Sequence, residues 1–240
     1  MIKLGILDAD ILREDLQEQY VSYAHMMLEL FHQIPKSELA HDIEFQFYNV
    51  MKGQYPKHFN ENDAYLITGS KSSAYDDDQW ILTLKEYIQC LFENNKKMLG
   101  VCFGHQLIAH TLGGKTELAP QGWGVGVHTY ATSKLAKDIT PVLGDDFSLL
   151  VSHRDQVTQL PNGASLIASS EFCPNAAYVI PEKVLSFQGH PEFVSEYANA
   201  LMQARKEIIE KETFETAQQN YQDRTQHLNV AKAMLGFIQG

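Results

Sequence analysis

Short apolar runs typical of buried strands alternate with longer segments of helical periodicity through the first half of the chain. The strand-like runs cover residues 2–7, 43–50, 64–68 and 98–101. Apolar residues recur every three or four positions over 11–34, 80–92 and 105–114. Pro35 ends the first of these segments, and Gly113 with Gly114 ends the last. Strand–helix alternation of this kind predicts a parallel sheet with helices on both faces.

The pattern changes between residue 115 and about residue 190. Short strand-like runs are separated there by turn sequences, Pro161-Asn162-Gly163 and Pro174-Asn175, which predicts added antiparallel or mixed strands. Residues 194–219 look helical, and a last short helix is expected over 228–238. We therefore expect an α/β fold, a flavodoxin-like three-layer sandwich with a central mostly parallel sheet and a small added antiparallel sheet. Residues 1–240 are expected to form one domain, with extra C-terminal helices from about residue 194.

The charge balance narrows the possible function classes. The 240 residues include 30 Asp and Glu against 19 Lys and Arg, which gives a formal net charge of −11. A nucleic-acid partner is not expected, because phosphate binding needs a basic face. The N-terminal sequence does not resemble a secretory signal, and no apolar stretch approaches the roughly 18 residues of a membrane span. We therefore expect a cytoplasmic protein with no membrane partner.

Only one of the three cysteines lies in a sequence context that suggests chemistry. Gly100-Val101-Cys102-Phe103-Gly104 ends a predicted strand and begins a predicted helix. This is the pattern of a nucleophile elbow with cysteine in place of serine, in which the amide of Phe103 is placed to donate to an oxyanion. The helix N-terminus would favour a thiolate. A buried structural cysteine beside strand-ending glycines is the alternative, and Cys90 and Cys173 are interpreted as structural.

A cysteine nucleophile needs a base, and His190 stands out among the ten histidines. A strand-like run precedes it, and Pro191 favours extended backbone before itself. Residues two apart share a face of an extended chain, so Glu192 could orient the imidazole and complete a Cys-His-Glu triad. The alternative is a surface histidine next to a glutamate in a turn. The other histidines show no convincing zinc spacing, so no metal is expected.

These motifs together resemble those of the class I glutamine amidotransferases. GVCFGHQ at 100–106 resembles the family's G-x-C-x-G-x-Q signature, and QGHPEF at 188–193 resembles its His-Pro-Glu segment. The intervening SHRDQV at 152–157 and the spacing from the cysteine to the histidine are also similar. The resemblance covers roughly residues 40–195. It is strongest to the amidotransferase domain of GMP synthetase and to stand-alone relatives that include γ-glutamyl peptidases.

The resemblance implies a role for each matching residue. Cys102 matches the nucleophile, His190 the general base and acid, and Glu192 the orienting carboxylate. Gln106 matches a glutamine that contacts the substrate. The loop that holds the α-amino and α-carboxylate groups of bound glutamine is matched by Ser152, His153, Arg154 and Asp155. A solvated turn with an Arg–Asp pair is the alternative for that loop.

The second oxyanion donor is expected in the turn after residues 64–68, at the amide of Gly69 or of Ser70. GMP synthetase has Gly-Gly-Pro at this turn, whereas this chain has Gly69-Ser70-Lys71, and the stand-alone relatives often carry Gly-Ser. No P-loop motif for a nucleotide is found. The departure therefore points towards the stand-alone relatives.

The resemblance implies a cysteine-dependent amidohydrolase that uses no cofactor. The expected substrate is a small molecule, glutamine or a γ-glutamyl amide, whose side-chain amide is cleaved through a thioester on Cys102. Three alternatives stay open: a γ-glutamyl peptidase for glutathione-like compounds, a subunit that passes ammonia to a synthetase partner, and a non-catalytic regulatory protein.

Overall fold

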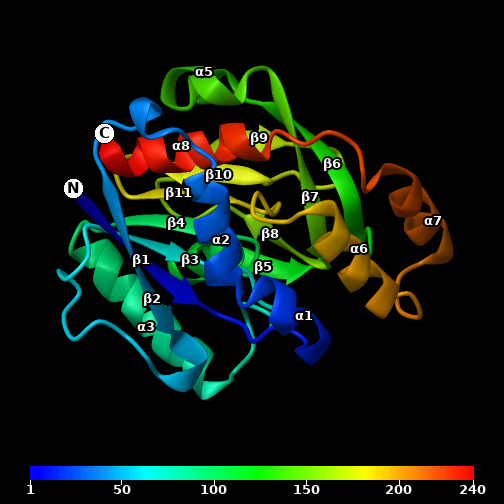
Figure 1. Cartoon of the computed structure of the whole chain (residues 1–240), viewed down its shortest axis with the longest axis horizontal. Coiled ribbons are helices and arrows are strands. Elements are labelled where there is room, and N and C mark those ends of the chain that lie inside the picture. Colours follow the sequence, from blue (N-terminus) through cyan, green and yellow to red (C-terminus); the bar gives the residue numbers. More distant parts are fainter.

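A nine-stranded mixed sheet runs through the centre of the computed structural model, which describes residues 1–240 (Figure 1). Its parallel half consists, in spatial order, of β2 (Ile43–Asn49), β1 (Ile2–Asp8), β3 (Ala64–Ile67), β4 (Lys97–Val101) and β11 (Val184–Phe187). The sheet continues with antiparallel strands β10 (Ala177–Ile180), β9 (Ser165–Ser169), β6 (Gly124–Thr132) and β7 (Asp146–His153). A separate antiparallel pair is formed by β5 (Lys115–Leu118) and β8 (Asp155–Gln159). The predicted fold class is confirmed.

Helices cover both faces of the parallel half. One face is covered by α2 (Tyr23–His32) and α8 (His227–Gln239), which lie in front of the strands in Figure 1. The other face is covered by α3 (Gln79–Glu93) and α4 (Phe103–Thr111). Along β1, Leu4 and Ile6 pack into the first core and Leu7 into the second. Because successive strand residues point to opposite faces and both faces are covered, the inner strands are mostly apolar on both faces.

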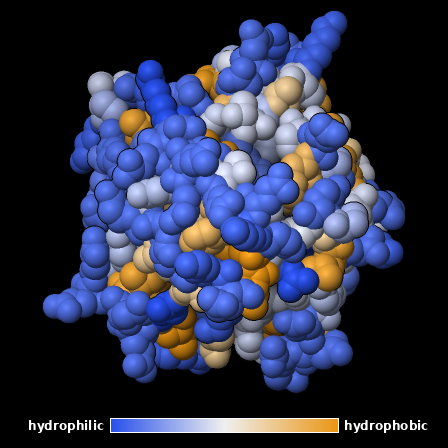
Figure 2. Space-filling view, turned by 90° about the vertical axis from the view of Figure 1, so that its right-hand side faces the viewer, coloured by the Kyte–Doolittle hydropathy of each residue, from blue (hydrophilic) through white to orange (hydrophobic).

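The remaining helical elements are short and lie at the ends and edges of the sheet. They are α1 (Glu14–Tyr20), α5 (Lys134–Ile139), α6 (Ser195–Ala204) and α7 (Lys211–Asn220), with 3-10 turns at Lys36–Glu38, Val50–Lys52 and Pro141–Leu143. The side of the molecule that carries α6 and α7 is mostly hydrophilic, with scattered hydrophobic patches (Figure 2). None of the helices combines the length and the apolar character needed to cross a bilayer.

The segment 11–34, predicted as one helix, forms two. The backbone of Val21 has φ 61°, a value that a right-handed helix cannot contain, so α1 ends there. The hydroxyl of Ser22 then accepts a hydrogen bond from the amide of His25 at 3.2 Å and caps α2. The apolar spacing continues through the break, which is why periodicity alone does not reveal it.

The segment 194–219 is also divided. It contains α6 and α7, and the chain from 205 to 210 turns between them. The amide of Arg205 donates to the carbonyl groups of Leu201 and Met202, which closes α6. The helix therefore ends inside the predicted segment, and the turn brings the side chain of Arg205 to Ser152 on β7.

The first turn of α4 packs directly on β3 at Gly104. A Cβ atom added at this residue would lie 2.2 Å from the carbonyl oxygen of Ile67. The amide of Gly104 also donates to the carbonyl of Thr68 at 3.1 Å. The helix approaches the strand this closely because position 104 has no side chain.

We expect Gly104→Ala to destabilise the protein by about 2–3 kcal/mol, because the methyl group must push α4 off β3. Urea unfolding followed by circular dichroism measures this. Gly236→Ala is the matched control: Gly236 lies inside α8 with no atom within 4 Å of an added Cβ, so alanine there should stabilise by roughly 0.5–1 kcal/mol. Equal unfolding midpoints for the two variants would contradict the packing argument.

Candidate active site

Cys102 occupies a sharp turn between β4 and α4. Its backbone has φ 49° and ψ −101°, a conformation that non-glycine residues rarely adopt. The amide of Cys102 donates to the carbonyl of Phe187 at 2.9 Å, and its carbonyl accepts from the amide of Gln106 at 3.0 Å. A Cβ atom at Gly100 would meet the backbone of residues 104–105 at 2.8–2.9 Å. The structure therefore has the backbone geometry of a nucleophile elbow, and the flanking glycines are required by it.

His190 follows β11 and is buried beside Cys102. Its amide donates to the carbonyl of Leu150 at 2.9 Å, which fixes its position against β7. Its Nδ1 atom lies 2.8 Å from Oε1 of Glu192, and the two side chains are 3% and 0% exposed. The ring of Phe193 stacks on the imidazole with centroids 3.8 Å apart. The imidazole is thus held by a carboxylate at one nitrogen and by an aromatic face.

The charge of Glu192 decides the protonation of this imidazole. Burial by itself lowers the pKa of His190, but the negative charge of Glu192 and the neighbouring Cys102 outweigh it and raise the pKa to about 10. His190 is therefore a cation at neutral pH, and a cation beside a cysteine is a suitable partner for a thiolate.

The turn after β3 lies against the same two side chains. A Cβ atom at Gly69 would be 2.8 Å from Cε1 of His190 and 3.8 Å from Cβ of Cys102. The hydroxyl of Thr68 accepts from the amide of Ala9 at 2.9 Å, and Asp10 accepts from the amide of Lys71 at 2.8 Å, so both ends of the turn are fixed. The amides of Gly69 and Ser70 donate to no other backbone group. Both stay candidates for the second oxyanion donor, together with the amide of Phe103 at the start of α4.

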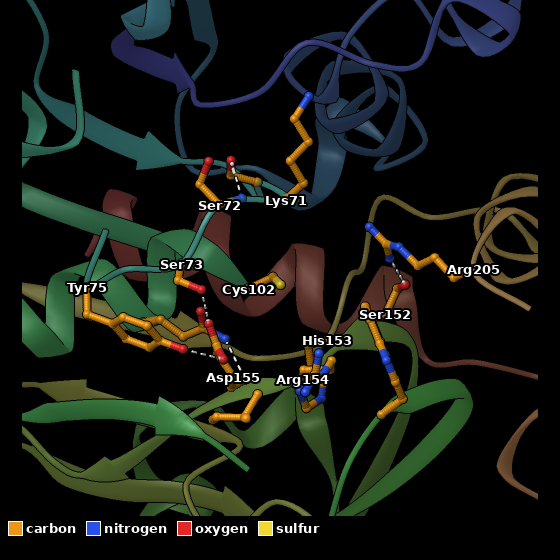
Figure 3. A pocket seen from close by; sticks show the side chains of 14 residues that line it. Lys71, Ser72, Ser73, Tyr75, Cys102, Ser152, His153, Arg154, Asp155 and Arg205 are labelled. Atoms are coloured by element: carbon orange, nitrogen blue, oxygen red, sulfur yellow. Dashed lines mark hydrogen bonds between the residues drawn. The ribbon is translucent and has the colours of Figure 1, made fainter. Parts of the chain in front are cut away.

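A pocket of about 400 Å³ opens over Cys102 (Figure 3). It brings Cys102 together with Gln106, Ser70 and the whole loop of residues 152–155. Its wall is completed by Lys71, Ser72, Ser73, Tyr75, Leu118, Trp123 and Arg205. Almost all of these wall residues lie outside the sequence motifs. The fold brings them to the pocket over Cys102, at the carboxyl end of β4.

Asp155 and Gln106 are held in place at one side of the pocket. The carboxylate of Asp155 accepts from the hydroxyl of Ser73 at 2.5 Å and from that of Tyr75 at 3.0 Å. Nε2 of Gln106 donates to the carbonyl of Asp155 at 2.7 Å and to Oε1 of Gln188 at 3.1 Å. Asp155 makes no ion pair with Arg154, so the alternative of a solvated Arg–Asp turn does not describe this loop.

The other residues of the predicted loop differ from Asp155 in their burial and in their contacts. His153 is buried, burial lowers its pKa to about 3, and neither ring nitrogen has a hydrogen-bond partner in the chain. The hydroxyl of Ser152 accepts from Arg205. The guanidinium groups of Arg154 and Arg205 lie 5.7 Å and 5.1 Å from the ring of Trp123. Trp123 and Arg205 are not among the predicted site residues, because neither lies in or next to a sequence motif.

The other two cysteines lie away from this pocket. Cys173 is buried in the core, and burial raises the pKa of its thiol to about 12, whereas Cys90 is half-buried on α3. No group of three or more His, Cys, Asp or Glu side chains is arranged to hold a metal ion.

Comparison with known proteins places this geometry in a family. The family model "Glutamine amidotransferase class-I" matches residues 20–209. The chain belongs to this family. A Saccharomyces cerevisiae protein provisionally named a glutamine amidotransferase is 30% identical over 232 residues, 92% of this chain and 90% of that one. The crystal structure of a glutamine amidotransferase from Thermotoga maritima shares the fold, with a TM-score of 0.74, 18% identity and coverage of 100% and 99%.

Family members with two different printed activities are similar to the chain. Gamma-glutamyl peptidase 3 of Arabidopsis thaliana is 34% identical over 160 residues, and the match covers 64% of each chain. GMP synthase of Bacillus pumilus is 36% identical over 141 residues, 57% of this chain and 26% of that one. The recognition of a class I glutamine amidotransferase is therefore confirmed, with relatives of both kinds that its motifs resemble. The roles of the individual site residues stay predictions.

Replacing Glu192 by Gln should lower the pKa of His190 from about 10, because the only charge that then opposes burial is that of the neighbouring Cys102. Nitrogen chemical shifts of the imidazole measured against pH by NMR test this. His105 is an internal reference, since burial lowers its pKa to about 3 and it should not titrate above pH ~5. Identical His190 titrations in the two proteins would contradict the assignment.

The same raised pKa predicts how stability depends on pH. Because the folded value lies above the unfolded value of about 6.5, the contribution of His190 to the unfolding free energy is complete below that pH. It should be lost as the pH rises towards 10, and this loss should be smaller in the Glu192→Gln variant. Urea midpoints measured for both proteins between pH ~6 and ~10 check the sign.

Proposed function

We propose that this chain hydrolyses the side-chain amide of glutamine, or a γ-glutamyl amide, through a thioester on Cys102. One observation carries the proposal. A cysteine in a strained elbow lies beside a buried histidine whose other nitrogen is 2.8 Å from a carboxylate. This is the order of nucleophile, base and orienting group that covalent catalysis requires. Membership of the glutamine amidotransferase family supports the same chemistry.

In the proposed acylation step, the thiolate of Cys102 attacks the amide carbon and the carbonyl oxygen becomes an oxyanion. The amide of Phe103 and that of Gly69 or Ser70 donate to this oxyanion, and each such donor contributes about 10²–10³ in rate. The imidazolium of His190 gives its proton to the leaving nitrogen as the C–N bond breaks. The products are the free amine or ammonia, a γ-glutamyl thioester on Cys102 and a neutral imidazole.

In the proposed deacylation step, neutral His190 takes a proton from water, and the hydroxide attacks the thioester carbon. The same amides hold the second oxyanion, the C–S bond breaks, and glutamate leaves. The thiolate of Cys102 and the imidazolium of His190 are restored, with the carboxylate of Glu192 stabilising the cation. One water is consumed in each turnover.

The glutamyl end of the substrate would bind beside Asp155. Its carboxylate, held by Ser73 and Tyr75, is suited to an ammonium group. Gln106 lies next to it, fixed by the carbonyl of Asp155 and by Gln188. Backbone groups of the loop 152–155 would take the α-carboxylate.

A γ-glutamyl peptidase is the second candidate. The Arabidopsis relatives bear that name, and the Gly69-Ser70 turn departs from that of GMP synthetase in the same direction. A synthetase partner that receives ammonia is the third, since GMP synthases are among the relatives. Purified protein tested on L-glutamine and on γ-glutamyl dipeptides separates the first two. Ammonia release from glutamine with no peptide cleavage would exclude the peptidase.

We expect Cys102→Ala to lower hydrolysis of both substrate types by at least about 10³-fold, because no other group replaces the nucleophile. Acid quenching during turnover, followed by mass spectrometry, should show one γ-glutamyl group on Cys102 of the unchanged protein and none on the variant. Cys90→Ala is the control that keeps full activity, since this thiol lies on α3 outside the pocket. Undiminished hydrolysis by Cys102→Ala would rule out the thioester.

A further inference from the structure

The imidazole of His190 lies flat against the ring of Phe193. The two ring centres are 3.8 Å apart, and the ring planes differ by 12°. The two residues are 3% and 4% exposed, so bulk water does not surround the stack. Neutral aromatic pairs prefer an offset or edge-on arrangement with centres about 4.5–7 Å apart. The closer parallel arrangement places the whole imidazole, and any charge that it carries, over the face of the phenyl ring.

Aromatic side chains from neighbouring helices fix the ring of Phe193. Tyr23 on α2 is nearly parallel to it, with the centres 6.0 Å apart and an angle of 14°. Tyr197 on α6 stands across it at 68°, with the centres 4.8 Å apart. Tyr20 at the end of α1 contacts Tyr197 in the same way, also at 4.8 Å. Packing in this separate apolar cluster therefore sets the orientation of Phe193 relative to His190.

Few charged groups face the stack. Glu192 and Cys102 act on His190 directly and raise its pKa. The other titratable groups around the two rings come from β7, the chain after β1, α2, α6 and the turn after α6, and they are His153, Asp10, Tyr23, Tyr197 and Arg205. The histidine and the two tyrosines are neutral between pH ~6 and ~10, because burial lowers the pKa of the histidine to about 3 and raises the pKa of both tyrosines. The remaining two carry opposite charges. A change in the pKa of His190 can therefore be assigned to Phe193 as long as Glu192 and Cys102 are unchanged.

We propose that Phe193 is a positioning residue for His190, whose ring face holds the imidazole in its plane and favours the imidazolium over the neutral form. The face of an aromatic ring carries a negative potential, which attracts a cation more strongly than a neutral imidazole. Burial strengthens this attraction, because no solvent screens it. The preference for the cation is independent of catalysis, whereas its use to protonate the leaving nitrogen rests on the proposed function.

A residue that only fills space would change the imidazole in the opposite direction. A cavity of about 350 Å³ lies beside Phe193, so water can approach His190 when the side chain is made smaller. Water would relieve the burial that lowers the pKa of His190, and this pKa would stay constant or rise. Loss of a ring that stabilises the cation lowers the pKa instead. The direction of the change therefore separates the two roles.

Two replacements remove the negative ring face in different ways. Phe193→Leu keeps an apolar side chain without a ring. Pentafluorophenylalanine introduced at position 193 keeps the ring and its approximate shape, but its face is electropositive. We expect each to lower the pKa of His190 by about one unit, a tenfold change in the protonation equilibrium. Phe193→Tyr, which keeps the ring face, should have the wild-type value. Imidazole nitrogen chemical shifts followed against pH by NMR measure all three.

Phe214→Leu is the matched control. Phe214 is buried to a similar degree in another apolar cluster on α7, so loss of this ring should reduce stability and leave the pKa of His190 unchanged. Hydrolysis of glutamine gives a second measurement. On the alkaline side, kcat should fall at a pH about one unit lower in Phe193→Leu than in the wild type or in Phe214→Leu, with KM unchanged.

The fluorinated protein decides the outcome, because it keeps the volume of the ring. An unchanged or raised pKa of His190 in this protein overturns the inference. If Phe193→Leu fails to fold, as judged by its melting temperature, the fluorinated protein and Phe193→Tyr still make the comparison. A lowered pKa together with a wild-type protein that hydrolyses neither glutamine nor any γ-glutamyl compound supports the inference and overturns the proposed function instead.

Discussion

The amide of Cys102 donates to the carbonyl of Phe187, and this one backbone bond between β4 and β11 sets the geometry of the whole site. It extends the parallel register in which Val101 pairs with Phe187, so the two strands end together. The chain after β4 turns into α4 through Cys102, and the chain after β11 reaches His190 three residues later. Because both strands belong to one sheet, Cys102 and His190 meet although they are 88 positions apart in sequence. A shift of one residue in this register would turn each strand side chain to the opposite face.

The buried side chains of His190 and Glu192 are each stabilised by the charge of the other. Both side chains are almost fully removed from water, and each charge is tolerable only because the other lies 2.8 Å away. Oε2 of Glu192 has no hydrogen-bond partner, so the carboxylate forms its hydrogen bond with the imidazole of His190 alone. Such a pair adds little net stability compared with apolar residues, but removing one partner leaves an uncompensated charge. Its presence in the core is therefore better explained by the imidazolium that it maintains than by folding.

The sequence predicts those features that depend on short stretches of chain. The apolar runs locate the strands of the parallel half, and glycines at 100 and 104 reveal the elbow because a tight strand-to-helix turn cannot hold a Cβ atom there. The helix break at Val21 is not predictable in this way, since Ser22 caps α2 inside an unbroken apolar pattern. Asp155 could be assigned to the pocket by its motif, but not its contacts with Ser73 and Tyr75, which join residues about 80 positions apart. Trp123 and Arg205 could not be assigned to the pocket from the sequence for the same reason. Only the tertiary structure places Arg205 next to Ser152 and Trp123 next to both arginines.

The net charge of −11 does not describe the pocket, because two arginines line it. An acidic protein repels an anionic ligand at long range, but salt screens charges beyond roughly 8 Å at physiological ionic strength. At contact distance the local groups decide, and the pocket that contains Ser152 also contains Arg154 and Arg205, which form no ion pair within the chain. The two motifs predicted to be catalytic lie at the ends of β4 and β11. Arg205 comes from the turn after α6 and Trp123 from the chain before β6, so part of the pocket wall is supplied by segments outside the motifs. The motifs and the rest of the pocket wall thus come from different parts of the chain, and only the motifs have a sequence signature.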